Sequence, residues 1–171
     1  MGCDIHSVAI DANGNVIEGG KWADGKTANP DCEYTHGEGE PFGWRIYGVF
    51  AFLAGVRNYS GIAPISEPRG LPADLKPDAR DDYWHDDCWL GDHSFSWLSV
   101  AELVEFDYDA MMEDRRVAGR LASGMISGAC TAEPGHGKRM TWREFLGPDF
   151  FHDLAELQRI GADRVVFGFD S

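Results

Sequence analysis

The sequence predicts an α+β fold, in which a small antiparallel sheet is formed by an N-terminal hairpin and a C-terminal strand and has helices packed on one face. Three observations lead to this prediction. Apolar residues alternate in the first and last segments, apolar residues recur at helical spacing between them, and two long segments rich in Gly, Pro and Asp are typical of loops. The 171 residues suit a single domain spanning residues 1–171.

The first 56 residues supply the hairpin, a loop and the first helix. Residues 3–10 are predicted to form a strand, Asn13-Gly14 a hairpin turn, and residues 16–22 the returning strand. Residues 23–43 are rich in Gly, Pro, Asp and Glu, which indicates a loop. Residues 46–56 place their apolar side chains at helical spacing and end near a glycine, so we expect a helix there.

The middle of the chain is predicted to be irregular first and helical afterwards. Residues 57–95 contain several prolines and many aspartates, and we expect a long irregular segment. Ser99 and Glu102 have the spacing of a capping box, which predicts a short helix as far as about residue 106. Residues 109–122 have an amphipathic pattern that favours another helix, and residues 124–137 are expected to form a second loop.

The last segment combines a helix with the closing strand. Thr141 and Glu144 repeat the capping-box spacing, and Pro148 occupies a favourable first helical position before residues 149–160. Residues 164–170 alternate as a strand does. We therefore expect this strand to pair with the N-terminal hairpin.

Composition limits the possible partners. The net charge of −14 opposes binding of a nucleic-acid polymer, whose affinity depends on Lys and Arg that neutralise phosphates. It leaves room for a small phosphorylated ligand held by a few arginines. No stretch approaches the roughly 18 uncharged apolar residues of a membrane span, and the first residues lack the pattern of a secretory signal. We expect a protein without membrane contact, in the bacterial cytoplasm, with its four cysteines reduced.

The first candidate site joins Asp4 and His6 to His93. Residues two apart in a strand share a face about 7 Å apart, so the carboxylate of Asp4 and the imidazole of His6 are expected to lie side by side. With His93 they would make a hydrolytic metal site, for which zinc or manganese is the candidate metal. The competing interpretation is a structural histidine satisfied by Asp4.

A second candidate metal site combines Cys32 and His36 with His85 and Cys88. Two cysteines and two histidines would close a structural zinc site between the two long loops. The alternative is that these are unrelated loop residues.

The third candidate is an anion site with aromatic neighbours. Two prolines stiffen the segment around Arg69, which suits a guanidinium that clamps a phosphate, and Arg57 would add a second contact. Tyr59 and Trp97 would offer flat rings to a nucleobase. The competing interpretations are that the arginines pair with the surplus acids and that the aromatic rings belong to the core.

Four stretches carry a resemblance to a family. They are Met-Gly-Cys-Asp-Ile-His at residues 1–6, and residues 47–57, 68–72 and 93–98. The chain resembles an uncharacterised family of short bacteriophage and prophage proteins that begin in the same way. The resemblance implies a bacterial or phage setting and brings no activity with it.

Three functions remain open from the sequence. The favoured prediction is a phage-type accessory protein, with a role against host defence, that binds a small phosphorylated or nucleotide ligand through Arg57, Arg69, Tyr59, Trp97 and the strand bearing Asp4 and His6. The first alternative is a metal-dependent hydrolase or phosphodiesterase that uses Asp4, His6 and His93. The second is an acidic interaction protein that inhibits a nucleic-acid-binding partner. The sequence leaves the question of turnover and the oligomeric state open.

Overall fold

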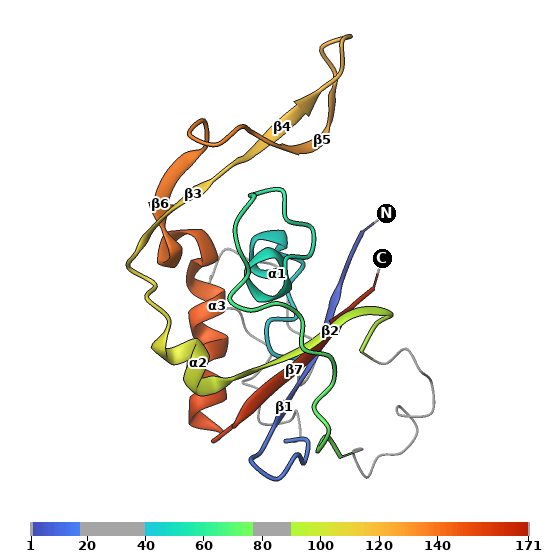
Figure 1. The fold of residues 1–171 in the computed structure, drawn as a ribbon, viewed down its shortest axis with the longest axis vertical. Helices are drawn as coiled ribbons and strands as arrows, with labels where there is room; N and C mark the ends of the chain where they lie inside the picture. Colours follow the sequence, from blue (N-terminus) through green and yellow to red (C-terminus); the bar gives the residue numbers. More distant parts are fainter. Residues whose placement is uncertain (1, 18–39, 77–89, 171) are drawn as a thin grey trace. The chain divides into compact units, whose positions relative to one another are not determined.

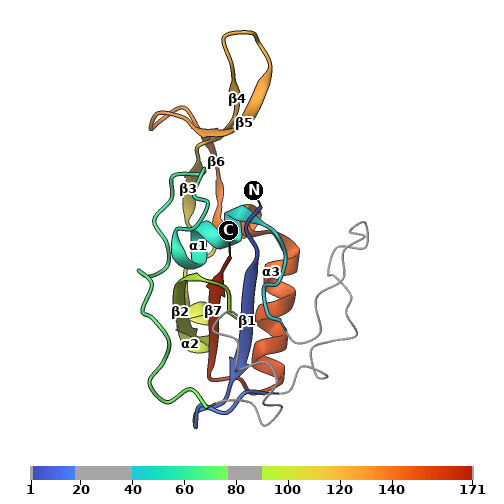
Figure 2. The same cartoon turned by 90° about the vertical axis from the view of Figure 1, so that its right-hand side faces the viewer.

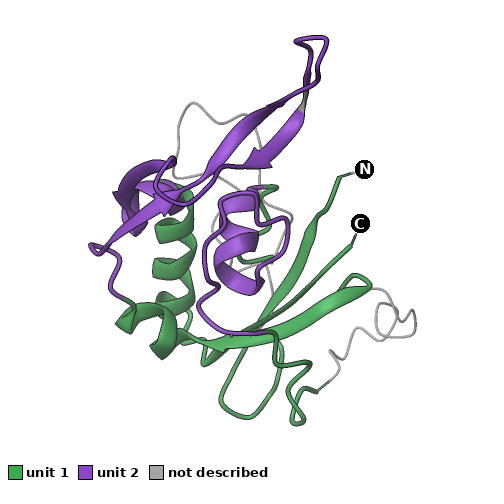
Figure 3. Cartoon of the chain, turned by 45° about the horizontal axis from the view of Figure 1, so that its top comes forward, with its two compact units in different colours: residues 1–45, 68–106, 148–171 green, residues 46–67, 107–147 purple. Residues whose placement is uncertain are grey.

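The structure, a computed structural model, describes residues 2–17, 40–76 and 90–170 and has the predicted α+β class (Figure 1). The chain divides into two compact units, coloured separately in Figure 3. Unit 1 comprises Met1–Arg45, Pro68–Phe106 and Pro148–Ser171. Unit 2 comprises Ile46–Glu67 and Asp107–Gly147.

Unit 1 is built on a three-stranded antiparallel sheet. Strand β7 (Arg164–Phe169) lies between β1 (Ile5–Ile10) and β2 (His93–Ser99), as Figure 2 shows. The predicted pairing of the last strand with the N-terminal hairpin is therefore confirmed. The prediction that residues 57–95 form one irregular segment is wrong at its end, because β2 begins at His93 and pairs along β7.

One face of this sheet is the buried core face. Its side chains come from alternate positions of the three strands: Ile5, Ser7, Ala9, Ser96, Leu98, Val165, Phe167 and Phe169. The hydroxyl of Ser7 donates to the carbonyl of Pro41, and the next residue, Phe42, stacks on Phe150 and donates its backbone N–H to Asp153. Because Phe150 and Asp153 belong to the last helix, that helix packs on this face.

The opposite face carries a smaller apolar cluster. Ile10, Leu90 and Val166 are buried there. They are surrounded by partly buried apolar side chains: Val8, Val16, Leu75, Phe95 and Trp97. The alternation of the strands thus gives the sheet one fully buried face and one face closed mainly by loop residues.

The hairpin turn after β1 forms as predicted. Gly14 has a φ of 79°, a conformation that favours glycine, and Val16 pairs with Ile10. The carboxylate of Asp11 accepts from the backbone of Asn13 and Asn15 and fixes the turn. The remainder of the predicted returning strand, from residue 18, lies outside the described residues.

Both predicted capping boxes are present. Helix α2 (Val100–Glu105) begins after Ser99, which exchanges capping hydrogen bonds with Glu102. Thr141 and Glu144 do the same at the start of α3 (Trp142–Arg159). This helix is interrupted at Gly147, whose φ of 78° is not helical, and it restarts at Pro148. No helix among the described residues is long and apolar enough to cross a membrane.

Unit 2 contains the predicted first helix, α1 (Tyr47–Ala54). It ends at Gly55, whose φ of 71° allows its N–H to bond back to the helix. After α1, Asn58 forms paired hydrogen bonds with the backbone of Ile62 and closes a turn.

The helix predicted over residues 109–122 is wrong. This part of unit 2 forms β3 (Met111–Asp114) and β4 (Arg116–Arg120), which pair with β6 (Lys138–Thr141) and β5 (Ile126–Thr131) respectively. The loop predicted over 124–137 therefore contains a strand. The amphipathic pattern was real, but it is also compatible with a hairpin, and strand partners farther along the chain decide between the two.

Candidate functional site

His6 lies within a group of charged side chains in unit 1. Its side chain lies on the sheet face opposite the core and is 30% exposed. The ring Nε2 is 3.1 Å from Oδ2 of Asp170, and Nδ1 is 3.7 Å from Oε1 of Glu40. Each ring nitrogen therefore faces a different carboxylate.

Asp170 connects His6 to Asp4. Its second oxygen, Oδ1, accepts the backbone N–H of Asp4 at 2.8 Å. The carboxylate of Asp4 itself accepts hydrogen bonds from the guanidinium of Arg45 with both oxygens. The carboxylate of Asp4 therefore bonds Arg45, whereas the carboxylate that bonds the imidazole of His6 is that of Asp170. We call Asp4, His6, Glu40, Arg45 and Asp170 the His6 cluster.

The carboxylates keep His6 ionised. Glu40, followed by Asp170, raises the pKa of His6 from 6.5 to about 9, against the opposing effect of burial. In return, the hydrogen bond from His6 lowers the pKa of Asp170. Asp170 is nevertheless the closer of the two carboxylates, at 3.1 Å from the ring against 3.7 Å for Glu40. At neutral pH the cluster therefore presents an imidazolium between two carboxylates.

His93 does not join this cluster. In the antiparallel ladder His6 lies opposite Gly168, whereas His93 lies opposite Phe169, the next residue of β7. Neighbouring residues of a strand point to opposite faces, and the ring of His93 stacks on that of Phe169. The predicted metal triad of Asp4, His6 and His93 is therefore not assembled. Among residues 2–17, 40–76 and 90–170, no group of three or more His, Cys, Asp or Glu side chains is placed to hold a metal ion.

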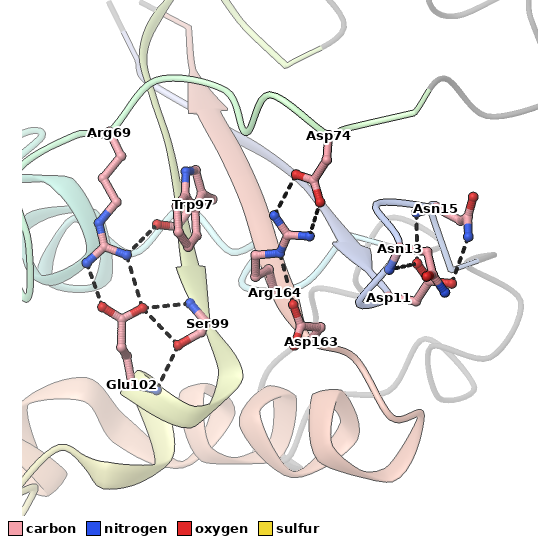
Figure 4. A network of polar contacts seen from close by, with 10 residues as sticks. All are labelled: Asp11, Asn13, Asn15, Arg69, Asp74, Trp97, Ser99, Glu102, Asp163 and Arg164. Atoms are coloured by element: carbon pink, nitrogen blue, oxygen red, sulfur yellow. Dashed lines mark hydrogen bonds and ion pairs between the residues drawn. The ribbon is translucent and has the colours of Figure 1, made fainter.

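Arg69 and Trp97 come together, as predicted for the anion site. The guanidinium carbon of Arg69 lies 4.9 Å from the centre of the Trp97 ring (Figure 4). The same guanidinium forms two hydrogen bonds to the carboxylate of Glu102, which also caps α2 through Ser99. Arg69 thus has a carboxylate partner, which matches the interpretation in which it pairs with one of the surplus acids.

Arg164 adds a second guanidinium to this ring. Its guanidinium carbon lies 5.6 Å from the ring centre of Trp97. It forms a two-point contact with Asp74, at 2.8 and 2.7 Å, and its Nε donates one hydrogen bond to Asp163 (Figure 4). Both cations on Trp97 are therefore neutralised by the protein's own carboxylates, so this stack ties strands and loops together.

The other two predicted ligand-binding residues belong to unit 2. Arg57 follows α1 and has a φ of 49°, in the left-handed region. The ring of Tyr59 lies 6.2 Å from that of Tyr47, and its carbonyl accepts from the hydroxyl of Thr131. Their part in ligand binding stays a prediction.

The predicted zinc site of Cys32, His36, His85 and Cys88 lies outside the described residues.

Three members of the His6 cluster were not anticipated from the sequence. Asp170 could have been, because it falls two residues after Gly168 on a strand already expected to pair with the hairpin, and alternation brings it to the face of His6. Glu40 and Arg45 come from a loop segment, whose sequence offers no such periodicity.

Comparison with known proteins gives no relative. No protein-family model matches this chain, and searches of the curated proteins and of the solved structures find no match.

Proposed function

We propose that the His6 cluster binds the phosphate of a small phosphorylated molecule, such as a nucleotide, in the place that Glu40 occupies beside His6. The observation that supports this proposal is that Asp170 is held more firmly beside the His6 ring than Glu40 is. Asp170 is 3.1 Å from the ring and is fixed by a second hydrogen bond to the backbone of Asp4. Glu40 is 3.7 Å away. Glu40 is therefore the partner that an incoming anion displaces.

Exchange of Glu40 for a phosphate is favourable on electrostatic grounds. A phosphate monoester carries about −1.5 to −2 charges at neutral pH, more than one carboxylate, and offers several acceptor oxygens. It preserves the anion that Glu40 provides to Nδ1 of His6, so the imidazole stays ionised. Asp170 holds the ring orientation throughout, as an acidic partner orients a functional histidine in many sites.

Arg45 offers a second cation within the same cluster. Its guanidinium is bound to Asp4 and half-exposed to solvent. It sits directly over Gly2, where an added Cβ would lie only 2.7 Å from Nη1. A guanidinium so placed can share a phosphate oxygen while it keeps one contact to Asp4.

The setting proposed for this activity is that of a phage-type accessory protein in the bacterial cytoplasm. The support is the resemblance carried by residues 1–6, which include Asp4 and His6 themselves. Phosphorylated small molecules, including nucleotide signals of host defence, are the ligand class that this chemistry would recognise.

Isothermal titration of the whole chain with pyrophosphate and with ADP at pH 6 tests the proposal. The wild-type protein should bind at least one of them. His6→Gln should weaken binding about 10- to 100-fold, which corresponds to the free energy of one hydrogen bond to a charged group. Glu40→Gln should tighten binding several-fold, because it removes the competing anion and leaves Asp170 on the ring. Arg159→Ala, which removes an exposed ion pair with Glu156, is the matched control and should have no effect.

Two results would overturn the proposal. One is the absence of binding by the wild-type chain and by Glu40→Gln alike. The other is binding that His6→Gln leaves unchanged while Arg69→Ala removes it, which would move the ligand to the Arg69–Trp97 stack.

A further inference from the structure

The β4–β5 hairpin, residues 116–131, forms a two-stranded sheet of its own. Among the described residues its strands pair only with each other (Figure 1). Every residue of β4 except Gly119 is exposed. A two-stranded ribbon of this length is marginally stable on its own, and no further strand of the described residues pairs with its outer edges. A hairpin of this kind gains stability when a partner covers one of its faces.

The hairpin also concentrates exposed apolar side chains. The described residues include seven large apolar side chains that are exposed, and four of them are in this hairpin: Val117, Leu121, Met125 and Ile126. Met125 and Ile126, beside the turn, are 64% and 68% exposed. Single exposed apolar residues are ordinary, but a group on one short element marks an interaction surface.

The charge of this region is opposite to that of the rest of the chain. Residues 111–141 hold five of the 15 Lys and Arg residues but only three of the 29 Asp and Glu residues, a net charge of +2 against −16 elsewhere. Arg45, Arg69 and Arg164 each bind a carboxylate. By contrast, the guanidiniums of Arg116 and Arg120 form no ion pair with any described residue. The fitting partner is therefore acidic as well as apolar.

We infer that the β4–β5 hairpin docks on a second copy of this chain, at the outer face of its α2 helix. The chain outside residues 111–141 has the required negative charge, and α2 combines it with an apolar side chain. Val104 is 45% exposed there, next to the exposed Glu105. Val104 can cover the apolar side chains of the hairpin while Glu105 pairs with Arg120. Reciprocal exchange between two copies gives a closed dimer in which this contact occurs twice.

Sedimentation equilibrium of the full chain, over roughly 1 μM to 1 mM, tests this contact across the range of weak to moderate affinities. The wild-type chain should form a dimer. Leu121→Ser/Met125→Ser should weaken it about tenfold or more, and Arg120→Glu and Glu105→Arg should each do the same. The double variant Arg120→Glu/Glu105→Arg should regain most of the lost affinity, because the pair is restored with its charges exchanged. Circular dichroism of each variant verifies that its fold is retained.

Three outcomes would overturn the inference. The first is a wild-type chain that stays monomeric over the whole range, including the case in which it binds duplex DNA through Arg116 and Arg120 instead. The second is a dimer that all of these hairpin substitutions leave intact. The third is a double charge exchange that fails to restore association, which removes α2 as the docking position.

Discussion

His6 and Asp170 are 164 residues apart in sequence and 3.1 Å apart in the structure. The contact joins the start of the first strand to the residue that follows the last strand, on the face opposite the core. Asp170 also accepts the backbone N–H of Asp4, so one carboxylate holds both the imidazole and the backbone that leads into β1. This arrangement links the proposed ligand site directly to the stability of the sheet.

Stability should fall with rising pH because of His6. Its pKa is raised from 6.5 to about 9 on folding, so the folded protein binds more protons than the unfolded chain between these values. The contribution is fully present below pH 6.5 and is lost as the pH rises through about 9. We expect His6 to contribute about 1–2 kcal/mol to the free energy of unfolding. This is less than the pKa shift alone implies, because the side chain is partly solvated.

Urea unfolding of the wild type and of His6→Gln at pH 6 and pH 10 measures this contribution. The difference in unfolding free energy between the two proteins should be larger at pH 6. This comparison cancels the titration of other groups. An equal difference at both pH values would refute an ionised His6 in the folded state.

Glu102 should contribute more to stability than an ordinary capping residue. Arg69 first, and Ser99 second, lower the pKa of Glu102 to about 2, so its contribution exists above pH 4.5 and disappears as the pH falls through 2. Glu102→Gln should cost up to about 1 kcal/mol of unfolding free energy at pH 7, because it removes the charge that Arg69 bonds, while glutamine can still serve in the capping box. Arg69→Ala should cost about 0.5 kcal/mol, since the pair is partly exposed.

The second capping box provides the matched control for this prediction. Glu144 caps α3 through Thr141 in the same way, but no arginine among the described residues bonds it. Chemical denaturation of Glu102→Gln, Arg69→Ala, their double variant and Glu144→Gln should show coupling between Arg69 and Glu102. Glu144→Gln should have the smaller effect of the two capping variants. Strict additivity of the Arg69 and Glu102 substitutions would contradict the role given to their contact.

Two glycines with similar φ angles should differ in how much stability the protein loses when each is replaced by alanine. Gly91 and Gly70 have φ values of 84° and 76°. A Cβ on Gly91 would lie 2.3 Å from the carbonyl oxygen of Phe169, whereas a Cβ on Gly70 would meet nothing within 4 Å. Gly70→Ala should cost about 1 kcal/mol of conformational strain. Gly91→Ala should cost about 3 kcal/mol or more, because the strand β7 or the loop must shift as well.

Thermal unfolding of the two alanine variants gives the comparison directly. The melting temperature of Gly91→Ala should be several degrees below that of Gly70→Ala. Equal melting temperatures would show that the close approach of Gly91 to the end of β7 is not needed for the fold.

The features that depend on neighbouring residues could be predicted from the sequence. The alternation of residues 164–170 and the capping pairs Ser99–Glu102 and Thr141–Glu144 are short-range patterns, and the structure contains all of them. Such patterns succeed because each one is set by the geometry of a single strand or helix turn.

Features set by distant partners could not be predicted in this way. Residues 109–122 form strands because segments beyond residue 125 pair with them, and their own pattern does not contain that information. Similarly, Asp170 bonds His6 and Glu102 bonds Arg69. From the sequence we expected a metal or a ligand beside these two side chains. In so acidic a chain, the identity of the partner carboxylate depends on the fold.

The most direct test of the central claim is a pH titration of the His6 ring by NMR, with and without pyrophosphate, using His6→Gln to identify its signal among the six histidines. We predict a pKa of about 9 for His6 in the free protein, and a pKa and chemical shift that change when pyrophosphate takes the place of Glu40. A His6 that titrates near 6.5 and does not respond to pyrophosphate would contradict both the electrostatics of the cluster and its proposed role.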